Sequence, residues 1–183
     1  MKRTSSQIGD ELLVLRCQGG DRRALETLID RWQRRLWSHA LRLTASRDGA
    51  WEVVQEAWVA VIRGIGRLDD PARFAPWAFR IVTNKSADWV RKTGRGRDLF
   101  RELSDESEQP AEPPPAPDND TCPDDLHAAI DRLPAGQRSA LSLHYLEGLG
   151  VREVARALAI PPGTVKSRLH HGRETLKRIL EDR

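Results

Sequence analysis

Apolar side chains recur every three or four positions through the first half of the chain, the spacing that gathers them on one face of a helix. The longest run follows Asp21, a residue type that caps helix N-termini. Further helices are expected at about 11–17, after Asp48, and from near Pro71. The expected inward positions are Leu25, Leu28, Ile29, Trp32, Leu36, Ala40 and Leu43, then Ala50, Val53, Val54, Ala57 and Val61, then Phe74, Ala78, Ile81 and Val82. No segment alternates as a strand would, so the pattern predicts an all-α fold.

Near the C-terminus, two short apolar-periodic segments are separated by Ile-Pro-Pro-Gly at positions 160–163. Prolines remove backbone donors, so one helix should end there and the next should leave in a new direction. The apolar positions are Val151, Val154, Ala155 and Leu158 before the break and Val165, Leu169, Gly172 and Leu176 after it. The positions expected to face outward in the second segment are Lys166, Ser167, His170, His171 and Glu174. Such a helix-turn-helix places its second helix in the DNA major groove, although helical hairpins with a proline break also occur as plain structure.

Composition narrows the class of protein. Hydrophobic residues make up 39% and charged residues 31% of the chain, as in a folded, soluble protein. No apolar run reaches the roughly 18 residues that a membrane-spanning helix needs. The basic start MKRTSSQIGD has no apolar stretch behind it, and Cys17 and Cys122 show no metal-ligand spacing. We therefore expect no membrane insertion, no secretory signal and a reducing, cytoplasmic location.

Charge divides the chain into parts. Residues 102–125 hold nine acidic residues and no Lys or Arg, which leaves 30 basic and 18 acidic residues elsewhere. A basic body suggests a polyanionic partner. The segment 93–122 is acidic, rich in proline and poor in aliphatic residues, so we expect a flexible, extended linker. It would join an N-terminal four-helix domain at 6–92 to a C-terminal helix-turn-helix domain at 123–183.

Three segments resemble bacterial RNA polymerase sigma factors of the extracytoplasmic-function (ECF) type. They read GAWEVVQEAWVAV from residue 49, FAPWAFRIVTNKSADWVRK from residue 74, and EGLGVREVARALAIPPGTVKSRLHHGRETLKRIL from residue 147. The contiguous GTVKSRL is the most specific match. The chain departs from the family at Trp51 and Glu52, where an acid and Asp are usual, and at His171, where many relatives carry Arg.

This resemblance implies a promoter-recognition subunit whose partners are core RNA polymerase, promoter DNA and, commonly, an anti-sigma factor. It assigns polymerase docking to Glu52, Gln55, Glu56 and Val59. It assigns minus-ten recognition and melting to the loop at about 66–73 and to Arg80, Asn84, Asp88, Arg91 and Lys92. It assigns minus-thirty-five recognition to Thr164, Lys166, Ser167, Arg168, His170, His171 and Arg173.

Within these surfaces, Asn84 is expected to read a base edge, while Arg80, Arg91 and Lys92 catch phosphates. For the rings of Trp77 and Phe79, packing in the core is the preferred interpretation. The resemblance also implies that the linker threads the polymerase cleft, where its acids would mimic RNA.

The sequence gives less support to other functions. No catalytic set and no phosphate loop appears, so we expect neither an enzyme nor a cofactor. Adjacent residues of a helix point about 100° apart, so His170 and His171 are not expected to bind a metal. A stand-alone helix-turn-helix regulator is the main alternative, and symmetric DNA half-sites would favour it. An enzyme that acts on nucleic acid is the third class, but the sequence shows no cluster of metal ligands or catalytic bases that would support it.

Overall fold

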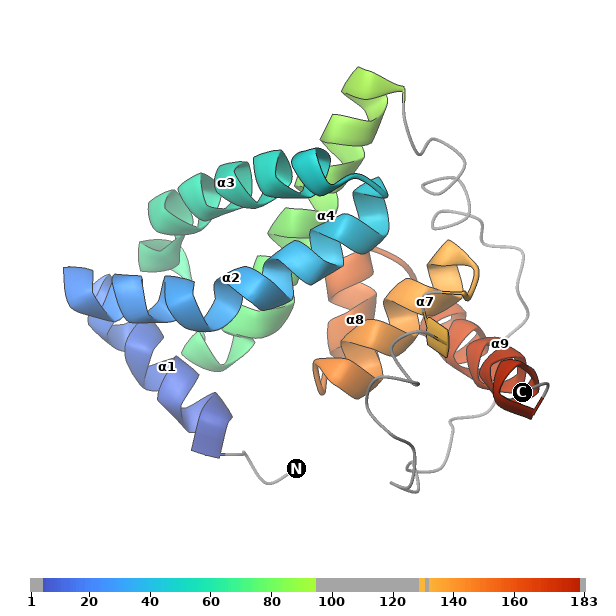
Figure 1. Ribbon diagram of the computed structural model, residues 1–183. Coiled ribbons are helices and arrows are strands. Elements are labelled where there is room, and N and C mark those ends of the chain that lie inside the picture. Colours follow the sequence, from blue (N-terminus) through green and yellow to red (C-terminus); the bar gives the residue numbers. More distant parts are fainter. Residues whose placement is uncertain (1–4, 95–128, 131, 182–183) are drawn as a thin grey trace. The chain divides into compact units, whose positions relative to one another are not determined.

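The computed structural model describes residues 5–94, 129–130 and 132–181, and the regular elements within those ranges are all helical (Figure 1). The predicted all-α fold is confirmed. The chain divides into two compact units, Met1–Thr93 and Gly94–Arg183. Most of the predicted linker, 95–122, lies outside the described residues. The hypothesis that its acids mimic RNA concerns the same segment and stays a prediction.

The first unit consists of four α-helices and two short 3₁₀ turns. The elements are α1 (Ser5–Gln18), α2 (Arg22–Thr44), α3 (Arg47–Gly64), η1 (Ile65–Arg67), η2 (Pro71–Arg73) and α4 (Phe74–Thr93). Asp21 caps α2 as predicted, because its carboxylate accepts hydrogen bonds from the backbone N–H groups of Arg23 and Ala24. Pro71 opens η2 rather than α4, which begins three residues later.

Helix α1 begins at Ser5, about two turns before the start that apolar spacing predicted. Its early turns are held to α2 by polar contacts instead. Arg31 of α2 lies 3.3 Å from the Asp10 carboxylate and donates a hydrogen bond to the Ser6 hydroxyl. Apolar periodicity does not reveal such polar contacts. The helix predicted from it was therefore too short.

The core of the first unit lies where α2, α3 and α4 pack side by side (Figure 1). Trp32 of α2 meets the rings of Phe74 and Phe79 edge-on, at centroid distances of 5.2 and 5.9 Å. Phe79 is fully buried, which confirms the core role expected of it, whereas Trp77 is only half-buried. Aromatic side chains bury large areas, so this cluster fixes the angle at which α4 crosses α2.

One polar pair is buried in that core. The Nε2 atom of His39 in α2 lies 3.0 Å from the Thr83 hydroxyl of α4. That hydroxyl donates to the Phe79 carbonyl, so it accepts from His39 and the imidazole carries its proton on Nε2. Burial, with a smaller contribution from nearby Arg42, lowers the pKa of His39 to about 3.

The buried histidine predicts how stability depends on pH. Unfolded histidine takes up a proton below about pH 6.5, whereas folded His39 stays neutral down to about pH 3. The free energy of unfolding should therefore fall as pH drops from 6.5, with a slope that approaches about 1.4 kcal/mol per pH unit. All six tryptophans lie between residues 32 and 89, so tryptophan fluorescence during urea unfolding reports this unit alone. A His39→Gln variant should show a shallower slope, and an unchanged slope would contradict the assignment.

The second unit contains the predicted helix-turn-helix. Its elements from residue 132 to residue 181 are α7 (Ala135–Leu141), a π-helical turn η3 (Ser142–Leu146), α8 (Val151–Leu158) and α9 (Pro162–Glu181). Helix α8 ends at Leu158 and is capped by Ala159, whose φ of 60° is left-handed, and α9 begins at Pro162, within the predicted break. Val165 and Leu169 are fully buried, and a Cβ on Gly172 would lie 2.6 Å from the Leu141 side chain. Only glycine allows α9 to approach α7 this closely.

Candidate functional site

The predicted polymerase-binding residues form one exposed face of α3. Glu52, Gln55, Glu56 and Val59 are all exposed, as the apolar positions of that helix implied. Trp51, Val59 and Ile62 are 45%, 48% and 47% exposed, so the face carries an apolar stripe beside its acids. Ile62 was not among the predicted polymerase-binding residues, although its helical spacing from Val59 was a usable signal. Mixed apolar and polar surfaces of this kind are typical of protein interfaces.

The two acids of this face, Glu52 and Glu56, contact side chains of α4. The Lys85 ammonium of α4 lies 2.9 Å from the Glu56 carboxylate. Glu52 accepts a hydrogen bond of 3.0 Å from the Trp89 indole and lies 3.9 Å from the Lys92 ammonium. The predicted polymerase face and the predicted DNA helix are therefore in direct contact. The ion pair of Lys85 with Glu56 was not predicted, because it depends on how α3 and α4 pack, and apolar spacing does not reveal that packing.

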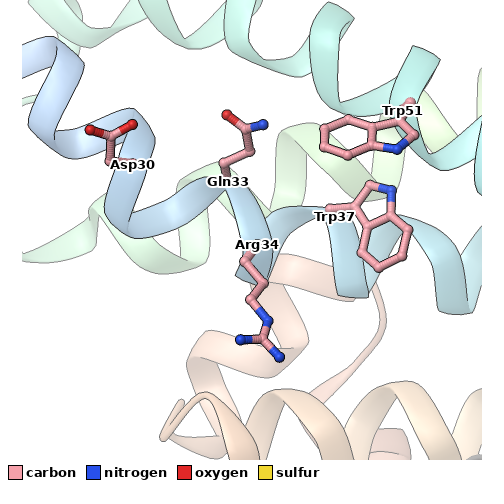
Figure 2. Close-up of a pocket in the computed structure, with 5 residues that line it drawn as sticks. All are labelled: Asp30, Gln33, Arg34, Trp37 and Trp51. Atoms are coloured by element: carbon pink, nitrogen blue, oxygen red, sulfur yellow. The ribbon is translucent and has the colours of Figure 1, made fainter.

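A pocket of about 360 Å³ lies beside the N-terminal end of this face. The Trp51 ring of α3 and the Trp37 ring of α2 lie 5.8 Å apart, tilted by 39°. Figure 2 shows the two rings beside each other and Asp30, Gln33 and Arg34 placed along α2. Trp51, one of the departures from the family pattern, is therefore paired with a second aromatic ring.

The predicted minus-ten residues share one side of α4. Asn84, Asp88, Arg91 and Lys92 are exposed, and Arg80 is half-buried one turn before Asn84. The Arg91 guanidinium forms an ion pair with the Asp88 carboxylate. The expected geometry is present, and the DNA-binding roles of these side chains stay predictions.

The loop before α4 is held by three kinds of contact. The side chain of Ile65 is buried, and the Asp70 carboxylate caps η2 by accepting from the Ala72 N–H at 3.1 Å. The Gln18 side-chain amide, at the end of α1, donates to the carbonyls of Ile65 and Leu68 at 2.9 and 2.8 Å. Gln18 was not among the predicted residues, since nothing in a local pattern links it to a loop about 50 positions away.

The predicted minus-thirty-five residues divide into buried and accessible groups. Lys166, His170 and Arg173 are half-buried and His171 is exposed. The prediction that Ser167 faces outward is wrong, because it is fully buried and its hydroxyl donates to the Gly163 carbonyl at 3.1 Å. Arg168 and Thr164 are also buried, at 3% and 7% exposure, so the structure does not present them to DNA. Helix α9 packs against both α7 and α8, which makes its buried face wider than one apolar stripe.

Neither a metal site nor a membrane-spanning helix is present among the residues that the structure describes. Among them, no three His, Cys, Asp or Glu side chains are close enough together to hold a metal ion. Within the same ranges, no helix is both long and apolar enough to cross a membrane. The absence of a metal site and of a cofactor remains a prediction for the whole chain.

Comparison with known proteins gives matches in both units. Residues 28–96 match the family described as "Sigma-70 region 2", and residues 124–176 match "Sigma-70, region 4". The chain is 30% identical over 181 residues to the Escherichia coli "ECF RNA polymerase sigma-E factor", with 94% of each chain covered. It is 29% identical to the Pseudomonas aeruginosa "RNA polymerase sigma-H factor", with 96% of each covered.

A solved structure supports the fold. The sigma factor RpoE from Bartonella quintana, crystallised with the anti-sigma factor NepR, matches with a TM-score of 0.61 and 24% identity. The match covers 85% of this chain and 96% of that one.

Proposed function

Because the chain belongs to the ECF family of RNA polymerase sigma factors, we propose that three surfaces divide the work of initiation among its helices. The chain binds core RNA polymerase and directs transcription from specific promoters, as its family does. The observation that carries the division is the separate placement of an acidic-apolar face on α3, a polar face on α4 and a basic outer face on α9.

Helix α3 docks on core polymerase in this proposal. Trp51, Gln55, Val59 and Ile62 follow one another at helical spacing, with Glu52 and Glu56 beside them. Burying the apolar stripe supplies affinity, whereas the acids set orientation and partner choice. The aromatic pair of Trp37 and Trp51 enlarges this surface at one end. Aromatic side chains are enriched among the residues that dominate interface energy.

Helix α4 and the loop at 65–73 read and hold the melted minus-ten element. Asn84 offers a donor and an acceptor to the exposed edge of an extruded base. Arg80, Arg91 and Lys92 contact phosphates, which positions the strand without reading its sequence. Lys85 joins this set, because its ammonium lies on the same helix at the boundary with α3.

Helix α9 reads the minus-thirty-five element in the major groove. Lys166, His170, His171 and Arg173 are the accessible members of the predicted set and carry the contacts in this proposal. A neutral histidine at 171 offers one donor and one acceptor, where arginine would bring a permanent charge. Ser167, Arg168 and Thr164 instead hold the helix in place from within the unit.

The wider setting follows from this role. A sigma factor is an initiation factor, and in this proposal the chain carries no catalytic activity and binds no cofactor. It acts in the cytoplasm, where core polymerase is found. The Bartonella quintana relative is bound by an anti-sigma factor, and we propose that this chain has a partner of the same kind. A stand-alone regulator is not favoured, because the matches span both units and include the segment that carries α3.

Photocrosslinking tests the proposed division. A photoreactive amino acid at position 55, 84 or 171 is placed in the full chain, which is then bound to core polymerase and promoter DNA. Position 55 should crosslink to a polymerase subunit, position 84 to the unpaired minus-ten strand, and position 171 to the minus-thirty-five duplex. A crosslink from position 55 to DNA, or from position 84 to polymerase alone, would contradict the assignment.

A further inference from the structure

We propose that Gln18 is a positioning residue that holds the minus-ten loop in the arrangement needed to read an extruded base. The proposal rests on the reading role proposed above for the loop at 65–73. It adds a residue from α1, outside both the loop and α4, to the determinants of promoter specificity. Gln18 acts on DNA through the loop backbone and makes no contact with the base.

The Gln18 side chain is bonded to both ends of one turn of the loop. Both contacts come from the Nε2 atom of Gln18, which has two hydrogens and so can donate to both carbonyls at once. The Ile65 carbonyl also accepts from the Leu68 backbone N–H at 3.2 Å. Gln18 therefore binds the turn at Ile65 and Leu68, the two residues that the backbone hydrogen bond joins.

The clamp acts on the part of the loop that faces solvent. Gly66, Arg67 and Asp69 are exposed, so they are available to a ligand, and they lie within or directly after the clamped turn. No Cβ contact would restrain Gly66, because nothing lies within 4 Å of that position. The first half of the loop is held by the buried Ile65 side chain, by backbone hydrogen bonds at Ile65 and Leu68, and by the two bonds from Gln18 that tie these residues to α1. The second half is fixed by the Asp70 cap.

A fixed loop matters for specificity more than for folding. A site discriminates among bases when its groups are held near the productive geometry, because a loose site must be ordered at each binding event. Gln18 is half-buried at the end of α1, and both of its partners lie in the loop rather than in the core. Loss of its donors should free the loop while α2, α3 and α4 stay packed.

The substitution that isolates the clamp is Gln18→Glu. Glutamate keeps the size of the side chain but, when ionised, cannot donate to a carbonyl and repels it. Gln18→Lys restores donors at the same position. Gln7→Glu makes the same chemical change at an exposed position of α1 and serves as the matched control.

The main measurement is the rate of promoter opening by holoenzyme on templates that carry each of the four bases at the extruded position. Wild type, Gln7→Glu and Gln18→Lys should prefer one base, whereas Gln18→Glu should lose at least fivefold of that preference. Its affinity for core polymerase should stay within twofold of wild type. Backbone amides of 66–70 should also exchange hydrogen at least tenfold faster in free Gln18→Glu than in Gln7→Glu.

Three results would overturn the proposal. Unchanged base preference in Gln18→Glu would show that the clamp does not position the loop. Equal losses of base preference, core affinity and thermal stability would show that Gln18 only supports the fold. If wild type itself shows no base preference while the loop amides respond as expected, the reading role of the loop fails, and the clamp loses its function with it.

Discussion

Replacing Glu56 with arginine should lower the affinity of the chain for core RNA polymerase by at least tenfold. Glu56 lies on the exposed face of α3, next to Gln55 and about one turn from Val59. Reversing a charge within an interface removes a favourable contact and places like charges together, which costs about 2–5 kcal/mol when the pair is buried by the partner. The measurement is a titration of fluorescently labelled chain with sigma-free core polymerase.

The control for this variant is Glu26→Arg. Glu26 is an exposed acid of α2 that pairs with Arg22 four residues earlier, so the same charge reversal occurs away from α3. Its affinity for core should stay within twofold of wild type. Because Glu56→Arg also faces Lys85, circular dichroism and tryptophan fluorescence must first show that the unit is folded. A folded Glu56→Arg variant with wild-type affinity would remove α3 from the docking surface.

Replacing Asn84 with alanine should slow promoter opening and relax the preference at one minus-ten position. An amide that pairs directly with a base edge contributes roughly 1–3 kcal/mol of discrimination. Asn84 is exposed, one turn from Arg80 and one turn from Asp88, so it is placed to meet a base while its neighbours meet the strand. Permanganate reactivity of unpaired thymines, followed over time on templates with each base, measures both effects.

The matched substitution is Asn119→Ala, which changes the one other asparagine of the sequence, in the linker. It should leave the opening rate and the base preference unchanged. If Asn84→Ala also retains both properties, the base is read by other groups, and the polar face of α4 serves only to hold the strand.

Apolar spacing predicted the helices well where hydrophobic packing decides the structure. The face of α2 that holds Trp32, and the break between α8 and α9, follow from residue types and proline chemistry within a few positions of one another. The same method gave too short an α1, because Arg31 secures its first turns by polar contacts from another helix. It placed Ser167 on the outside, because α7, which covers part of α9, was not among the predicted helices.

The residues of the functional surfaces were largely predicted, but the contacts that join these surfaces to other helices were not. Family motifs indicated the α3 and α4 residues, and the structure places them at the surface in the expected order. The contacts of Gln18 with the loop and of Lys85 with Glu56 join segments that are 29 or more positions apart. Only the packing of α1, α3 and α4 brings these groups together, so no local pattern could have predicted them.

This chain alone should give core polymerase its promoter specificity. The direct test is run-off transcription by sigma-free core on a pool of templates with randomised upstream sequence, with and without the full chain. Transcripts should appear only when the chain is present, and active templates should share two sequence elements, one near minus ten and one near minus thirty-five. Transcription that is equal with and without the chain, or active templates with no shared element, would contradict it.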